Sequence, residues 1–276
     1  MRAILPATML LWACSENLTP PPDRDPYAPP DQEQLSCLPD LDGRIEAREI
    51  QAALGIPVHY LVSPAGEERE VDLSGSVEDG QTLWDWSVDL DDDELAELEA
   101  EPLEEQWYAG SFAAGSFVSP LDAGATVEAV YREDEEALWL LGVASAEPDP
   151  PEGRTLVVYE DPVAAFQFPL APGSAWVATG EIRDGTLRGL PYAGRDIYEV
   201  VDDAMGTLAL PDLTFTQAHR VRTRVTVQPT VGQSVSRRQV SFVFECFGEV
   251  ARATSRDDEP EEDFTRATEV RRLGLR

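Results

Sequence analysis

Three carboxylates early in the chain have a spacing that suits a hard metal ion. Asp40 and Asp42 occupy alternating positions, Gly43 follows directly, and Glu49 comes a little further on. Calcium takes several oxygen ligands from a loop, needs a glycine at the sharp bend and receives a last carboxylate from the element that follows. The segment 38–49 is therefore a candidate calcium site with Asp40, Asp42 and Glu49 as ligands.

This spacing resembles the EF-hand calcium loop. With Gly43 at the sixth loop position, the three carboxylates fall at the third, fifth and twelfth positions, and Leu38 stands where the family has its first Asp. The resemblance implies a calcium-binding or interaction protein whose site has lost one ligand. The alternative is a vestigial loop that keeps its Asp-Gly turn and helix cap for structure alone. No other cofactor is indicated.

The first residues have the features of a secretory signal. Arg2 gives a positive start, an apolar stretch covers 4–12, and Ala13 precedes Cys14. A stretch this short cannot span a bilayer. Leu11, Ala13 and Cys14 resemble the lipobox of bacterial lipoproteins. That resemblance implies removal of a signal peptide, residues 1–13, and attachment of palmitate-type chains to Cys14. The alternative is an ordinary N-terminus with a chance cysteine.

The residue after Cys14 bears on the destination. It is Ser15 rather than the Asp that retains lipoproteins in the inner membrane. The resemblance therefore implies the outer membrane, with the protein facing the periplasm or the cell surface and held to the membrane by its N-terminal lipid. Residues 14–36 are rich in proline and poor in apolar residues, which predicts an extended tether.

The chain has three cysteines, an odd number for an exported protein. Lipidation of Cys14 would leave Cys37 and Cys246, and an oxidising compartment would allow these two to form a disulfide. Two separate buried thiols are the alternative.

Motifs for catalysis are lacking in the sequence. His59 and His219 have no second histidine or free cysteine at metal-ligand spacing. Ser111 and Ser116 lie in a repeated Ala-Gly-Ser-Phe, but no Gly-x-Ser-x-Gly, phosphate-binding loop or dinucleotide motif is present. These observations predict a protein that is not an enzyme.

Three tryptophans, Trp84, Trp86 and Trp176, are candidates for lining an apolar ligand cleft. Trp84 and Trp86 would share one face of a strand, because side chains alternate along a strand. The alternative is that these rings pack the core of a β-domain.

Short runs rich in branched and aromatic residues, separated by Gly, Pro and Asp, predict a mainly β protein. Residues 45–54 are predicted to form the single short helix, stopped by Gly55 and Pro57. From Arg220 to Val227, Val alternates with Arg or Thr, which indicates a strand with one buried and one wet face. The proline-rich residues 147–153 divide the rest into an acidic β-rich subdomain, 37–147, and a β-meander subdomain, 154–276.

Part of the second half resembles the β-rich periplasmic lipoproteins of Gram-negative bacteria. The resemblance rests on Phe168-Pro169-Leu170, on Gly173 to Trp176 and on the strand ending in Arg220-Val221-Arg222. Many of those proteins look like lipoprotein carriers, in which a curved antiparallel sheet or half-barrel wraps an apolar cleft. The resemblance implies that fold.

Charge narrows the range of partners. The chain carries 53 acidic residues against 21 basic ones, all of them arginine, and its net charge is −32. Such a protein repels nucleic acid and anionic head groups. The arginines gather in the second half, so acidic and basic faces could pair within a domain or between copies, although solvated faces are the default. The sequence thus predicts a non-catalytic envelope lipoprotein that binds an apolar small molecule or another envelope protein, or has a structural role.

Overall fold

The computed structural model describes residues 37–78 and 80–275, and residues 37–276 form one compact unit. The predicted signal peptide, the tether and Cys14 lie outside the described residues.

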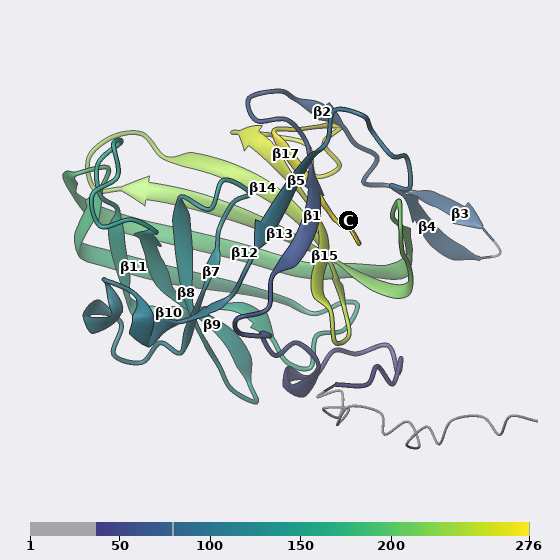
Figure 1. Cartoon of the computed structure of the whole chain (residues 1–276), viewed down its shortest axis with the longest axis horizontal. Helices are drawn as coiled ribbons and strands as arrows, with labels where there is room; N and C mark the ends of the chain where they lie inside the picture. The colour runs from purple at the N-terminus through teal and green to yellow at the C-terminus, as the bar shows by residue number, and fades with distance from the viewer. Residues whose placement is uncertain (1–36, 79, 276) are drawn as a thin grey trace, which may run out of the picture. The chain divides into compact units, whose positions relative to one another are not determined.

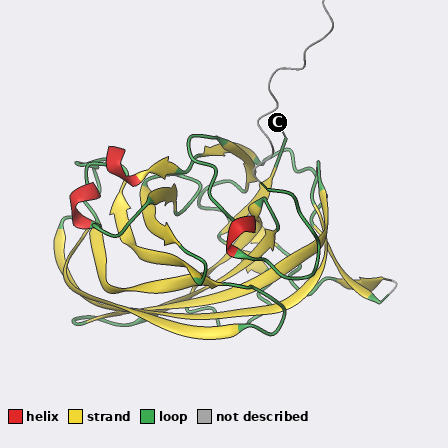
Figure 2. Cartoon of the chain, turned by 90° about the horizontal axis from the view of Figure 1, so that it is seen from below, coloured by secondary structure: helices red, strands yellow, loops and turns green. Residues whose placement is uncertain are grey.

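Strands dominate this unit (Figure 1, Figure 2). Their bounds are β1 (Val58–Val62), β2 (Arg69–Glu70), β3 (Ser76–Glu78), β4 (Gln81–Asp85), β5 (Glu94–Leu98), β6 (Glu101–Pro102), β7 (Phe117–Pro120), β8 (Val127–Glu133), β9 (Ala137–Ser145), β10 (Leu156–Gln167), β11 (Ala175–Leu187), β12 (Leu190–Ala209), β13 (Thr214–Pro229), β14 (Val235–Phe244), β15 (Gly248–Asp257), β16 (Arg266–Ala267) and β17 (Glu269–Leu273). Three short 3-10 turns complete the elements, namely η1 (Ala47–Glu49), η2 (Leu103–Glu105) and η3 (Ala109–Ser111).

Fifteen of the strands belong to one curved sheet, in the order β5-β1-β17-β15-β14-β13-β12-β11-β10-β9-β8-β7-β6; β4 also pairs with β12, and β3 pairs with β4. The pairings are antiparallel except between β4 and β12. The predicted mainly β fold with a large antiparallel sheet is confirmed, and the sheet is open (Figure 2).

The two edge strands of this open sheet are neighbours in the sequence. Only Glu99 and Ala100 separate β5 at one end of the order from β6 at the other. Loop contacts also join the two ends: Arg252 on β15 donates to the carbonyl of Leu121, and the amide of Ala123 donates to Glu269 on β17. The sheet therefore curves until its ends approach, although no ladder connects β5 to β6.

The predicted helix over 45–54 is wrong, because tertiary hydrogen bonds use the backbone groups that a helix would need. Ile45 forms a β-bridge with Leu170, with two N–H to O distances of 2.8 Å. The carbonyl of Glu49 accepts the amide of Cys246 at 2.6 Å. Only the single turn η1 remains between these two anchor points.

The link at 147–153 connects two strands of the same sheet. β9 and β10, which flank it, pair antiparallel from Leu156 and Ala144 onward. One sheet thus includes strands from both sides of the proline-rich link.

Candidate functional site

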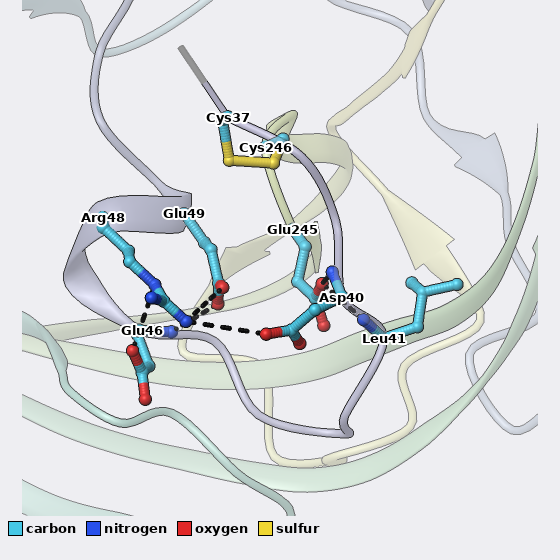
Figure 3. The surroundings of a disulfide bond; sticks show 8 residues. All are labelled: Cys37, Asp40, Leu41, Glu46, Arg48, Glu49, Glu245 and Cys246. Carbon is cyan, nitrogen blue, oxygen red and sulfur yellow. Dashed lines mark hydrogen bonds and ion pairs between the residues drawn. A yellow bond between two sulfur atoms is a disulfide. The ribbon is translucent and has the colours of Figure 1, made fainter. Parts of the chain in front are cut away.

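The predicted calcium loop is attached to the turn between β14 and β15 (Figure 3). The carboxylate of Glu245, which is only 2% exposed, accepts the amides of Asp40 at 2.8 Å and Leu41 at 2.9 Å. Carboxylate oxygens of Asp40, Asp42 and Glu245 lie within 4.8 Å of one another, a distance at which they could hold a metal ion. Sequence reasoning missed Glu245, because it lies 205 residues from Asp40.

Glu49, the third predicted ligand, is directed elsewhere. Its carboxylate accepts the amide of Glu46 at 2.9 Å and forms an ion pair with Arg48 at 3.5 Å. The structure therefore brings two of the three predicted ligands together, Asp40 and Asp42, and replaces Glu49 by Glu245.

The predicted pairing of Cys37 with Cys246 is present (Figure 3). Their Cα atoms are 5.5 Å apart, a usual distance for a disulfide, and 209 residues separate them in the sequence. The bond joins the first described residue to the same turn that carries Glu245.

The two histidines have different environments. His59 on β1 is partly exposed and faces Glu97 at 3.2 Å. His219 on β13 is buried, with its Nδ1 2.8 Å from Oδ2 of Asp202; His219 is 1% exposed and Asp202 is 0% exposed. Burial raises the pKa of Asp202, while the hydrogen bond to His219 opposes this rise. No substrate could reach this pair without a rearrangement of the sheet.

The two serines of the repeated Ala-Gly-Ser-Phe segment would need a partner that could activate a hydroxyl. Within residues 37–78 and 80–275, no acid or base is hydrogen-bonded to the hydroxyl of Ser111 or Ser116.

The three tryptophans do not line one surface. Trp84 and Trp86 lie in the largest core cluster, where both rings pack on Phe242 with centroids 4.9 and 5.1 Å away. Trp176 is packed against a different cluster, and its indole N–H donates to Ala164. Because Trp84 is 0% exposed, its ring has no open side for a ligand.

A network of buried and partly buried charges links three neighbouring strands. Glu249 on β15 accepts hydrogen bonds from Arg271 on β17, from Arg252 and from Ser241 on β14. Burial alone would raise the pKa of Glu249, but the two guanidiniums lower it to about 2. No motif in the sequence indicates this network.

Acidic and basic regions do meet within one chain. Arg272 binds Asp93, which belongs to the acidic run after β4. The loop at 258–263, here called the acidic loop, passes over β13 and β14, where Asp263 and the carbonyl of Glu262 bind Arg222. Part of the opposed charge seen in the sequence is therefore neutralised internally.

Beside the acidic loop lies a groove of about 260 Å³. Its lining includes Arg222, Arg224, Arg238, Val201, Val240 and Glu199. The arginine alternation on β13 was visible in the sequence, but the position of β14 next to it was not.

Comparisons of the chain with protein-family models, with curated proteins and with solved structures found no match. Among the residues that the structure describes, none of the helices has the length and apolarity needed to cross a membrane.

Proposed function

We propose that this protein is a non-catalytic lipoprotein of the bacterial cell envelope, held at the outer membrane by a lipid on Cys14. Its β-domain, facing the periplasm or the cell surface, has a binding or structural role, and its partner is a small molecule or an envelope protein rather than nucleic acid.

The observation that carries this proposal is the bond between Cys37 and Cys246. Structural disulfides are typical of exported proteins and rare in a reducing cytosol. This bond accounts for two of the three cysteines and leaves Cys14, at the end of the leader-like segment, as the one available for a lipid. The net charge of −32 supports attachment by acyl chains rather than by attraction to anionic lipid.

Metabolic labelling of the full chain in a Gram-negative host tests the anchor. An alkyne analogue of palmitate should label the wild-type protein and the neighbouring control variant Ser15→Ala, and both should sediment with outer membranes. The Cys14→Ser variant should be unlabelled and should leave the membrane fraction. A wild-type protein without label would overturn the lipid anchor.

A second candidate function is calcium binding by the loop at 38–49. The observation that favours it is the approach of carboxylate oxygens of Asp40, Asp42 and Glu245 to within 4.8 Å of one another, because two loop carboxylates and one from the β14–β15 turn form an oxygen donor set that suits calcium.

Thermal unfolding of the full chain tests this second function. Calcium chloride, compared with sodium chloride at equal ionic strength, should raise the midpoint of the wild type and of the control Asp184→Asn, an exposed acid on β11. Asp42→Asn should abolish the rise. An equal rise in Asp42→Asn would exclude the loop as the calcium site.

A further inference from the structure

Two arginines occupy directly opposite positions on neighbouring strands. Arg224 of β13 is paired with Arg238 of β14 in the antiparallel ladder, so their side chains leave the same face of the sheet. Both line the groove of about 260 Å³ described above. Like charges directly opposite each other destabilise a sheet, so this pair calls for a compensating negative group.

The carboxylates near the groove compensate the two arginines only in part. Asp203 is already shared between Arg220 and Arg222 through hydrogen bonds of 2.5 to 2.9 Å. The closest carboxylate to Arg224 belongs to Glu199, whose Oε2 lies 3.7 Å from Nη1, too far for a hydrogen bond.

Arg238 has even less compensation. Its Nε and Nη2 donate to the backbone carbonyls of Glu259 and Pro260, at 3.0 and 3.2 Å, which are neutral acceptors. Within the described part of the chain, no carboxylate forms an ion pair with Arg238. The acidic loop therefore positions this guanidinium through neutral carbonyls and forms no ion pair with it.

We propose that the groove binds a small molecule through one oxyanion group, a phosphate or a carboxylate, that bridges Arg224 and Arg238. A guanidinium has five N–H donors and binds such groups in a bidentate manner, and both arginines keep unused donors. Val201, which lines the groove and is exposed, gives an apolar contribution for the rest of the ligand. Glu199, Asp203 and Glu262 also line the groove, so a second negative charge on the ligand would be repelled.

Isothermal titration of the full chain tests this site with sodium phosphate and sodium acetate as probes. The ionic strength is held at about 0.15 M with sodium chloride, where the Debye length of about 8 Å screens the distant negative charge of the protein. We expect saturable binding of at least one probe. Arg224→Gln and Arg238→Gln should each weaken it about tenfold or more, because each removes one charged bidentate donor.

The control variant is Arg195→Gln. Arg195 lies on β12, is half exposed and hydrogen-bonds Gln228 outside the groove, so its loss should leave probe affinity unchanged. Co-sedimentation with phosphatidylglycerol vesicles distinguishes a lipid phosphate from a free one. Vesicle binding that depends on Arg224 and Arg238 would identify the lipid head group as the source of the phosphate.

Stability provides a second readout that a merely structural pair would not give. The bound probe should raise the unfolding midpoint of the wild type and of the control Arg195→Gln, and should raise it less in Arg224→Gln and Arg238→Gln, each compared with the same protein without phosphate or acetate. The proposal is overturned if no probe and no vesicle binds, or if Arg224→Gln and Arg238→Gln bind as tightly as the wild type.

Discussion

Replacing Glu249 by Gln should remove a favourable electrostatic contribution to the stability of the fold. Its carboxylate, 14% exposed, receives hydrogen bonds from Arg252 and Arg271, which lower its pKa from 4.5 to about 2. A difference of one in pKa corresponds to about 1.4 kcal/mol, so the ionised group stabilises the folded state by roughly 3 kcal/mol at neutral pH. The variant also leaves two arginines without their shared partner, and breaking a buried pair typically costs about 3 to 5 kcal/mol.

The pH dependence follows from the lowered pKa. The contribution is fully present above the unfolded-state value near 4.5 and is lost as the pH falls through about 2. Urea unfolding of both proteins, followed by tryptophan fluorescence with the disulfide intact, should therefore show a difference in unfolding free energy of about 3 kcal/mol at pH 7 that shrinks steadily below pH 5. Glu181→Gln, an exposed acid on β11, is the matched control and should change little. A difference between wild type and Glu249→Gln that stays constant from pH 7 to pH 3 would refute the electrostatic explanation.

Three further perturbations test other parts of the fold by the same unfolding measurement. Cys246→Ser removes the disulfide between cysteines 209 residues apart and should lower the unfolding free energy by up to about 5 kcal/mol. Reduction of the wild type by dithiothreitol should reproduce this loss. Equal stability with and without the reductant would show that the bond is absent in solution. Trp84→Ala, at a site 0% exposed, should cost about 3 to 5 kcal/mol, and a cost below about 1 kcal/mol would mean that the ring is not in the core. Gly142→Ala should lower the unfolding free energy by at least about 1 kcal/mol, because Gly142 has a φ of +149° and an added Cβ would lie 2.1 Å from the carbonyl oxygen of Val157. The control is Gly173→Ala, which is also at positive φ but has no atom near the added Cβ. Comparison of the two variants separates the cost of backbone strain from the cost of the steric clash.

The alternation of apolar and polar residues predicted strands well, because successive side chains of a strand point to opposite faces of the sheet. Val221, on the apolar side of the alternating segment, is 1% exposed, and Arg222 on the other side binds acidic groups across the surface. Alternation breaks within β12, although the strand continues from Leu190 to Ala209. Polar residues such as Asp202 and Asp203 interrupt the pattern but not the strand, since a bulge there lets each find an arginine or histidine partner.

The sequence predicted the candidate site residues only where those residues are close together in the chain. Asp40 and Asp42 share one turn and were identified together, but the carboxylate that completes their cluster comes from Glu245, next to the far cysteine. Pairing of the cysteines followed from counting them and needed no geometry. The groove depends on the register between β13 and β14, which sets Arg224 opposite Arg238, and strand register is not encoded in the spacing of either segment alone.

The disulfide at the first described residue also decides where mechanical load enters the domain. A pull on the chain ahead of Cys37 passes through the sulfur atoms to Cys246, in the turn between β14 and β15, two strands that have neighbours on both sides in the sheet. Residues 38–50, which are held by a few hydrogen bonds and one β-bridge, lie outside that line of force and are not peeled away first. The domain can therefore bear tension from its N-terminal side without losing the segment that carries Asp40 and Asp42.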